Sequence, residues 1–273
     1  MRTMTKLGAA FLLLLLAAIS APALADEIHF SASLDGSHEV PPVTTDATGS
    51  ATFTVNDAQT EIAFTLSVVG IDPANITAAH IHFGAPGVAG PILFTLASAS
   101  FTSPLTGTLT ATNLTPDASV GVNSFADAIA VMVAGNTYVN VHTTAHPDGE
   151  IRGQIGRVVE GVDVKIRKAI NPRSRGVIAV TILSNASFNA CTVDGSLATL
   201  GPAGAHAKRS HCVDVNEDGL SDLLMHFRTQ DTGIQCGDTS ITLSGQTSDG
   251  ASFTTTHSIR TVGCNGHGHG HSR

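Results

Sequence analysis

Two histidines, His80 and His82, stand one residue apart in the segment AAHIHFGAPGVAGPI, residues 78–92. Side chains along a β-strand alternate between two faces, so both imidazoles lie on one face if this segment is a strand. A third imidazole, His142, lies on the polar side of the later segment YVNVHT. Imidazole nitrogens bind copper and zinc well, and residues two apart on a strand are about 7 Å apart at Cα. The spacing therefore predicts a metal site.

A carboxylate completes the predicted site. The segment EIRGQI, residues 150–155, places Glu150 on its polar face. If the three strands are near neighbours, their polar side chains meet on one outer face of the sheet. The alternative is that these histidines only bond to neighbouring carboxylates and fix the strand register. The predicted ligands for copper or zinc are His80, His82, His142 and Glu150.

The elements that must position these residues are short strands. Turn clusters such as NDAQ, DPAN and HPDGE separate runs of alternating or β-branched residues. The predicted strands of the first half cover residues 28–34, 49–55, 61–70, 90–96, 107–114, 138–143 and 150–156. One helix is expected at residues 124–135, with Ser124 as its N-cap. This pattern predicts an all-β domain, a β-sandwich or partly closed barrel.

The second half continues the strand pattern. Its predicted strands cover residues 162–167, 176–184, 222–228, 239–247 and 258–263. We therefore predict a second, smaller β-domain over residues 158–264, after a first domain over residues 26–157. The tail NGHGHGHSR contains nothing to bury, so residues 265–273 are expected to be disordered.

The segment DVNEDGLSD, residues 214–222, has the spacing of a calcium loop. Oxygen ligands recur at alternating positions, and a glycine allows the sharp turn at the sixth position. The twelfth position is methionine rather than glutamate, so the loop is not an EF-hand. The alternative is an Asx-rich turn before a strand. The predicted calcium ligands are Asp214, Asn216, Asp218, the carbonyl of Leu220, and Asp222.

All four cysteines lie in the second half of the chain. An even number of cysteines in an exported protein indicates disulfides, and three pairings are possible. Pairing between sequence neighbours closes the shortest loops. We therefore predict Cys191–Cys212 and Cys236–Cys264.

Residues 1–25 have the composition of a signal peptide. Arg2 and Lys6 precede the apolar run AAFLLLLLAAISA, and Ala23-Leu24-Ala25 resembles a cleavage site. The apolar run is shorter than the roughly 20 residues of a membrane-spanning helix. We therefore expect an exported protein, periplasmic or secreted, without a membrane span.

The charge is distributed unevenly between the two halves. Residues 26–157 hold 12 acidic residues against only Arg152 and Arg157, whereas residues 158–273 hold 10 of each sign. A phosphate backbone requires a basic surface, so the acidic first half argues against nucleic acid as a partner. Cations or basic partners would be attracted to it.

Three long motifs resemble one family. SASLDGSHEVPPVTTDATGSATFTV, AAHIHFGAPGVAGPI and YVNVHTTAHPDGEIRGQI together resemble the CHRD domain, named after its repeats in chordin. The resemblance runs from about residue 28 to 156 and implies an extracytoplasmic all-β domain of bacterial type. The later stretch HFRTQDTGIQCGDTSITLSGQTSDG resembles a C-terminal module of exported bacterial proteins without a defined activity.

A second resemblance concerns the histidines. An HxH strand, a Gly-rich loop and a later VxVH strand are similar to copper-zinc superoxide dismutase. The resemblance implies that His80, His82 and His142 would be copper ligands on the wall of a β-barrel. The chain departs from that family, because it has no bridging histidine, no zinc-loop aspartate and no disulfide in this half.

These observations predict an exported, non-catalytic binding or interaction protein. Its partner would be an unidentified extracytoplasmic protein or ligand. The alternative is a copper-dependent redox enzyme or periplasmic copper carrier. Motifs of hydrolases, nucleotide-binding folds and zinc proteases are absent from the sequence.

Overall fold

The computed structural model describes residues 27–264, in which strands enclose two separate hydrophobic clusters. Strands form 44% of the structure and helical segments 12%. The all-β prediction is therefore confirmed. The signal peptide and the tail predicted at residues 1–25 and 265–273 lie outside the described residues. Among the described residues, no helix has the length and apolar character needed to cross a membrane.

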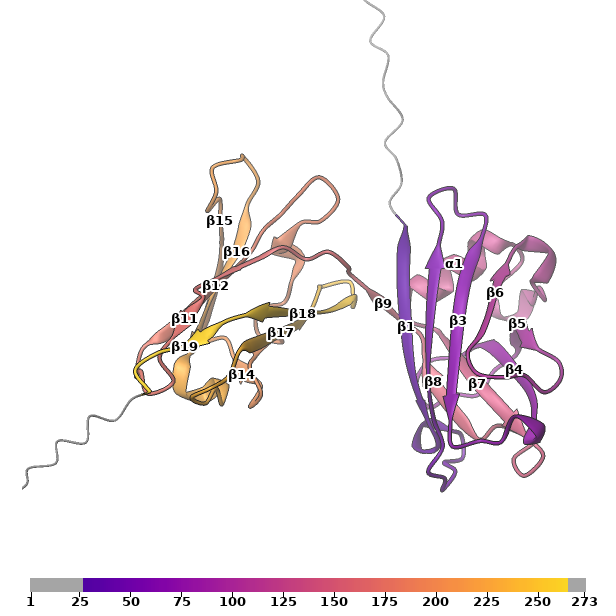
Figure 1. The fold of residues 1–273 in the computed structure, drawn as a ribbon. Coiled ribbons are helices and arrows are strands. Elements are labelled where there is room, and N and C mark those ends of the chain that lie inside the picture. Colours follow the sequence, from indigo (N-terminus) through magenta and orange to yellow (C-terminus); the bar gives the residue numbers. More distant parts are fainter. Residues whose placement is uncertain (1–26, 265–273) are drawn as a thin grey trace, which may run out of the picture.

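The first unit is one strongly curved sheet (Figure 1). The strands run in the order β5-β4-β7-β8-β1-β2-β3-β6, so β1 joins two halves that face each other across the core. Its strands are β1 (Ile28–Asp35), β2 (Thr48–Val55), β3 (Ile62–Val69), β4 (Ile76–Phe83), β5 (Ile92–Ala97), β6 (Leu105–Leu109), β7 (Thr137–Thr143), β8 (Ile151–Gln154) and β9 (Gly156–Val158).

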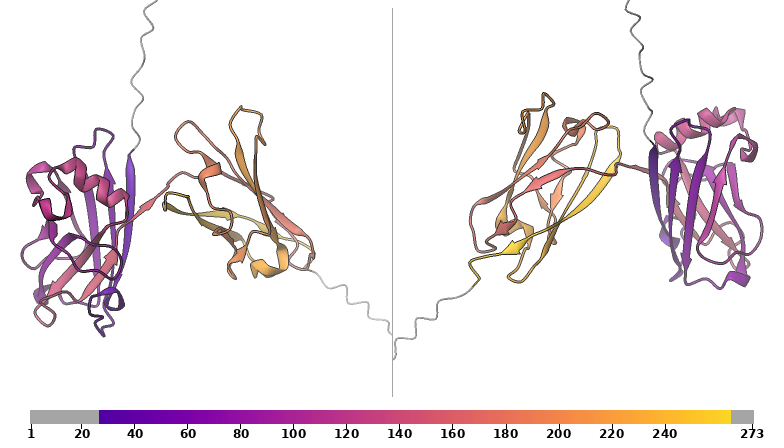
Figure 2. Two further views of the ribbon diagram at one scale, coloured as in Figure 1. Left: turned by 180° about the vertical axis from the view of Figure 1, so that it is seen from behind. Right: turned by 45° about the horizontal axis from the view of Figure 1, so that its top comes forward.

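Alternation along these strands builds the first core. In β3, for example, Ile62, Phe64 and Leu66 are buried while Ala63 is exposed. The helix α1 (Phe125–Val133) lies across one end of the strands (Figure 2) and buries Phe125, Ala128, Ile129 and Met132. Ser124 caps it, as predicted, by accepting a hydrogen bond from the Asp127 backbone N–H. Short 3-10 helices follow β1, β3 and β6 and precede α1: Gly36–His38, Pro73–Asn75, Ala111–Asn113 and Ala118–Val120.

The second unit surrounds its own core with two four-stranded arrangements and a short parallel pair. One arrangement follows the order β10-β12-β16-β15, the other β14-β13-β17-β18, and β11 pairs with β19. The strands are β10 (Val164–Ile166), β11 (Ala169–Ile170), β12 (Val177–Ile182), β13 (Thr199–Leu200), β14 (Ala205–His206), β15 (Arg209–Val213), β16 (Asp222–Arg228), β17 (Ser240–Gln246), β18 (Ser252–Ser258) and β19 (Arg260–Thr261). Two 3-10 helices, Ala190–Thr192 and Thr229–Thr232, complete the unit.

Both predicted disulfides are confirmed. Cys191 bonds to Cys212, and Cys236 bonds to Cys264. Both bridges lie in the unit with the second core, and no cysteine remains free among the described residues.

Strand β9 links the two units (Figure 1). It pairs with β1 through three residues and touches β18 through the single pair Val158–Ser252. Arg157 in this strand also forms an ion pair with Asp249. The predicted division at residues 157–158 falls within this strand and stays a prediction.

Candidate metal centre

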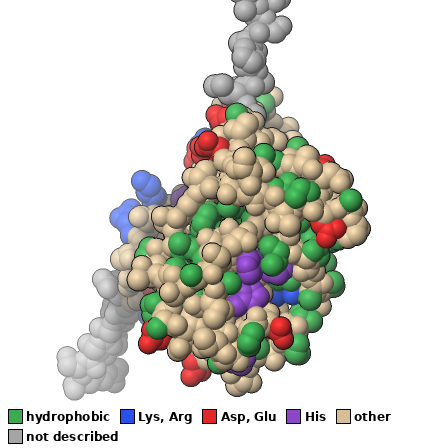
Figure 3. Space-filling view, turned by 90° about the vertical axis from the view of Figure 1, so that its right-hand side faces the viewer, with side chains coloured by type: hydrophobic (Ala, Val, Ile, Leu, Met, Phe, Trp, Pro, Cys, Tyr) green, Lys and Arg blue, Asp and Glu red, His purple; other side chains and the backbone are tan. Residues whose placement is uncertain are grey.

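Strands β4 and β7 position the three histidines. The strands pair antiparallel, and His142 of β7 lies opposite Ala78 of β4. Ala78 comes two residues before His80 in β4. Because residues two apart share a face, the rings of His80, His82 and His142 all project from one face of this pair. Figure 3 shows histidine side chains gathered on this side of the molecule among hydrophobic and neutral atoms.

The three rings converge on a common point. One potential ligand nitrogen from each ring lies within 4.8 Å of the other two. Nδ1 of His80 and Nε2 of His142 are 3.0 Å apart, and the ring centroids of His80 and His82 are separated by 5.6 Å. Within residues 27–264, no other group of three His, Cys, Asp or Glu side chains meets this criterion.

Backbone carbonyls orient two of the rings. Nδ1 of His82 lies 2.9 Å from the carbonyl oxygen of Gly90, and Nδ1 of His142 lies 2.9 Å from that of Pro147. A carbonyl only accepts, so both Nδ1 atoms carry the hydrogen. This orientation directs each Nε2 atom away from the carbonyl, the arrangement found in histidines that bind metals through Nε2.

The Nε2 atom of His82 is a buried polar atom without a partner. The side chain is 8% exposed, and this nitrogen has no hydrogen-bond partner in the structure. Leaving a buried polar atom unpaired costs about 1–3 kcal/mol, so a ligand that pairs with this nitrogen would stabilise the protein. Burial lowers the pKa of His82, and the nearby His142 and Arg152 add to the shift, whereas the Gly90 carbonyl and the Asn140 side chain oppose it. The ring is therefore neutral near pH 7 and able to donate a lone pair.

The neighbouring ring is held neutral as well. Burial lowers the pKa of His80 to about 4, and the proximity of His142 and His82 contributes to the shift. Three imidazoles with converging nitrogens suit a borderline cation such as Cu²⁺ or Zn²⁺.

Tyr138 and Arg152 support the buried histidine. The ring of Tyr138 stacks on His82 with centroids 4.9 Å apart, and the Arg152 guanidinium carbon lies 3.4 Å from the centre of the Tyr138 ring. Arg152 also donates to the carbonyl oxygens of Ala85 and Val88 in the loop after β4. The layered side chains fix both the His82 ring and the loop that holds its Nδ1 atom.

The histidine face is not an open outer surface, in contrast to the prediction. The polar side chains of these strands were expected to meet on an outer face, yet Tyr138, Asn140 and Arg152 are only 3%, 3% and 2% exposed. The loop between β4 and β5 covers this face by accepting hydrogen bonds from Arg152 and Gln154. Alternation assigned the correct face, but distant segments of the chain cover it.

Glu150 lies outside the group of converging ligand atoms. Its two carboxylate oxygens accept hydrogen bonds from the hydroxyls of Thr45 and Thr143. These bonds tie the segment before β8 to β7 and to the loop after β1. In this structure the Glu150 carboxylate therefore has a structural role, because both of its oxygens accept hydrogen bonds from threonine hydroxyls.

A different buried carboxyl group lies near Arg152 and Asn140. Glu39 is 7% exposed, and its Oε1 atom has no hydrogen-bond partner. Burial raises the pKa of Glu39 to about 7, although the positive charge of Arg152 opposes the shift. The sequence did not identify this residue, because HEVPP reads as an ordinary loop segment.

The predicted calcium loop forms a network of internal hydrogen bonds. Asp214 accepts from the backbone N–H groups of Glu217, Asp218 and Gly219. Asp222 is fully buried and accepts from the backbone of Ser184 and Val215. The loop does not form a converging ligand group of the kind that the histidines form. Calcium binding therefore remains a prediction.

A protein-family scan matched one part of the chain. Residues 30–155 match the CHRD domain. The matched residues extend from within β1 to the end of β8 and include His80, His82 and His142. No curated protein matches the chain.

The sequence indicated the three histidines but not the residues Tyr138 and Arg152 that stack beneath His82. The HxH spacing and the VxVH segment identified the ligands from side-chain alternation alone. Tyr138 could have been noticed as the only tyrosine of the chain, and Arg152 as one of two basic residues in the first half. Their stacking on His82 depends on the register between strands, which the sequence does not specify.

Proposed function

We propose that the protein is an exported, non-catalytic binding protein whose CHRD segment holds a copper or zinc ion through His80, His82 and His142. The observation that carries this proposal is the buried, unpaired Nε2 atom of His82, which shares a site with two further imidazoles. Partial exposure of His80 and His142 leaves the bound ion within reach of solvent or of a partner.

The ion would be held by three imidazole nitrogens. Three histidines leave a position for a water molecule or an external ligand, as in known three-histidine metal sites. When bound, copper or zinc supplies a Lewis-acidic centre to which a donor group on an extracytoplasmic partner can bind. The Gly90 and Pro147 carbonyls keep the His82 and His142 rings in the required orientation.

Export is supported by two independent features. Residues 1–25 have the composition of a cleaved signal, and both cysteine pairs are oxidised. Structural disulfides persist in oxidising compartments such as the periplasm and the extracellular space. Expression of the full-length chain followed by fractionation and intact-mass measurement tests the proposal. We expect a mature chain that begins near Asp26 in the periplasm or medium, and a full-length cytosolic chain would contradict export.

The metal proposal is tested by loading and counting. Each protein carries His267→Gln, His269→Gln and His271→Gln, so that tail imidazoles do not contribute. After exposure to Cu²⁺ or Zn²⁺ and gel filtration, elemental mass spectrometry should find about one ion per chain. His82→Ala should lose that ion, whereas the matched control His206→Ala, an exposed strand residue, should retain it. Equal metal content in the two variants would refute the site.

A copper-dependent redox enzyme or copper carrier is the second candidate. The partial exposure of His80 and His142 favours it, because external molecules could then reach the ion. Mixing the copper-loaded protein with ascorbate and oxygen separates a redox enzyme from a binding protein or carrier. Sustained oxygen consumption that His82→Ala abolishes would indicate an enzyme. Copper held without turnover supports a binding protein or carrier.

For the second unit we propose calcium binding by Asp214, Asn216, Asp218, Leu220 and Asp222. The spacing supports this proposal, as does the left-handed backbone of Gly219 with φ of 89°. Because a ligand of the native state raises stability, millimolar calcium should raise the thermal midpoint, and Asp214→Ala should remove the gain. An unchanged midpoint of the parent protein would reject calcium.

A further inference from the structure

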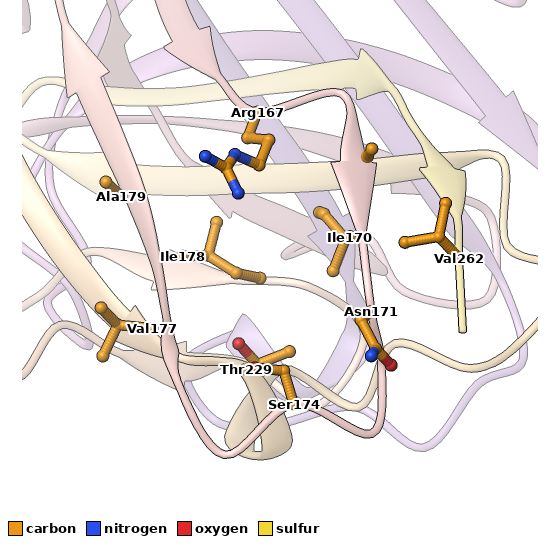
Figure 4. Close-up of a pocket in the computed structure, with 10 residues that line it drawn as sticks. Arg167, Ile170, Asn171, Ser174, Val177, Ile178, Ala179, Thr229 and Val262 are labelled. Carbon is orange, nitrogen blue, oxygen red and sulfur yellow. The ribbon is translucent and has the colours of Figure 1, made fainter. Parts of the chain in front are cut away.

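A pocket in the second unit lies apart from the histidines. It has a volume of about 370 Å³ and is bounded by β11, the start of β12 and the segment between them. The buried side chains of Ile170 and Ile178 form an apolar floor (Figure 4). Val177 and Val262 lie at its edge and are 52% and 37% exposed. Pockets of this size commonly hold small ligands.

Arg167 supplies a charge above this floor. Figure 4 shows its guanidinium directed over Ile178. Within residues 27–264, Arg167 forms no ion pair, and no hydrogen bond of its side chain is found. Arg157 and Lys208, by contrast, pair with Asp249 and Asp231. An unpaired guanidinium offers five donors in a planar arrangement that fits a carboxylate.

Two further arginines pair with residues of the pocket through the backbone. Arg228 pairs across the sheet with Val177 of the pocket edge, and Arg260 pairs with Ala169 of the pocket wall. Neither arginine forms an ion pair in the described part of the chain, and no aspartate or glutamate lines the pocket there. Uncompensated positive charge attracts anions and raises their local concentration.

The polar groups at the opposite end of the pocket are largely engaged. The Ser174 hydroxyl accepts from the Gly176 backbone, and the Thr229 hydroxyl donates to the Gly176 carbonyl. Asn171 accepts from the backbone of Arg173 through its side-chain oxygen. Arg167 is therefore the main charged recognition group, and the remaining contact surface is apolar.

We propose that this pocket binds a monoanionic carboxylate with a short apolar body. The carboxylate pairs with the Arg167 guanidinium, and the apolar body lies on Ile170 and Ile178. The volume admits on the order of ten non-hydrogen atoms, from the roughly 30 Å³ that one water molecule occupies. Two sources offer this chemistry, a free organic acid and the C-terminal carboxylate of a peptide that ends in an aliphatic residue.

The experiment uses the full chain labelled with ¹⁵N and two pairs of probes. Hexanoate is compared with hexanamide, and a peptide ending in Gly-Gly-Ile with a free carboxylate is compared with its C-terminal amide. We expect the carboxylates to shift the amide resonances of Ile170 and Ile178 and to bind at least about tenfold more tightly than the amides. If the peptide acid binds more tightly than hexanoate, the source is a peptide C-terminus. If hexanoate binds more tightly, the source is a free organic acid.

Arg167→Met keeps an apolar stem and removes the charge. It should weaken carboxylate binding by about tenfold or more, whereas Arg209→Met, at an exposed position in β15, should leave it unchanged. Equal binding of acid and amide, equal binding by the two variants, or no resonance shift at 20-fold excess of hexanoate would each overturn the proposal.

Discussion

The ring of His82 shows how a single side chain can be prepared for a ligand. It is stacked on Tyr138, bonded through Nδ1 to Gly90, and left without a partner at Nε2. The first two contacts remove the rotational freedom that binding would otherwise cost. The metal proposal rests on this unpaired nitrogen together with the two neighbouring imidazoles.

Glu39 gives a pH-dependent prediction at the same scale. Burial raises the pKa of its carboxyl group in the folded protein to about 7, above the ordinary value of 4.5. The folded state therefore favours the protonated form. The associated stability is complete below pH 4.5 and is lost as pH rises through 7, by up to about 3 kcal/mol. Glu39→Gln should remove this loss.

Urea unfolding of parent and variant between pH 4.5 and 8 measures the effect. The free energy of unfolding of the parent should fall relative to that of Glu39→Gln as pH rises. His80 acts in the opposite direction, because its pKa is lowered to about 4 and its stability contribution is lost as pH falls from 6.5. Since His80 is present in both proteins, its effect cancels in the difference. Parallel pH profiles would contradict the prediction.

At the scale of elements, β8 depends on glycine for its close approach to β1. A Cβ atom at Gly153 would lie 2.4 Å from the carbonyl oxygen of Ser33, which is backbone and cannot move cheaply. Gly153→Ala should therefore lower the free energy of unfolding by about 2 kcal/mol or more.

Gly156 provides a matched control in the next strand. A Cβ atom there meets nothing within 4 Å, so Gly156→Ala should change stability by less than about 0.5 kcal/mol. Denaturant unfolding of both variants checks the pair. Similar stability of the two variants would show that β1 and β8 are not as tightly packed as described.

The sequence predicted many elements because their signals are local. The expected strand at residues 61–70 appears as β3 (Ile62–Val69), and the expected helix at 124–135 appears as α1 (Phe125–Val133). Strand β18 (Ser252–Ser258) was missed because its Ser-, Thr- and His-rich sequence has only a weak apolar alternation. Its partner β17 stabilises it through seven paired residues, a contact that local patterns do not reveal.

The candidate site was predictable in its ligands but not in its surroundings. Period-two alternation is a property of any strand, so it grouped His80 and His82 without knowledge of the fold. Burial of Arg152 depends on the loop of Ala85 and Val88, which approaches from 64 residues or more away in sequence. Such a contact follows from tertiary packing and leaves no local signature.

At the scale of the whole molecule, the two cores differ in how they are stabilised. The first core contains no cysteine, whereas both disulfides lie in the unit of the second core. Loss of a native disulfide typically costs 2–5 kcal/mol. Reduction should therefore destabilise the second unit selectively.

Calorimetry with and without a phosphine reductant measures this difference. We expect two unfolding transitions in the oxidised protein, of which only one moves to lower temperature on reduction. Metal retention by the histidines should be unaffected at temperatures below the first transition. A joint shift of both transitions would show that the units unfold together and would argue against independent domains.

Each orienting carbonyl belongs to the same hairpin as the ring it holds. His82 and Gly90 are eight residues apart, and His142 and Pro147 are five apart. Each histidine and the carbonyl that fixes its tautomer therefore lie in one short segment of the chain. Grafting the two segments onto adjacent strands of an unrelated β-scaffold would transfer the ring orientations as well as the donor atoms. The pair of segments could then be used to design metal sites in other proteins.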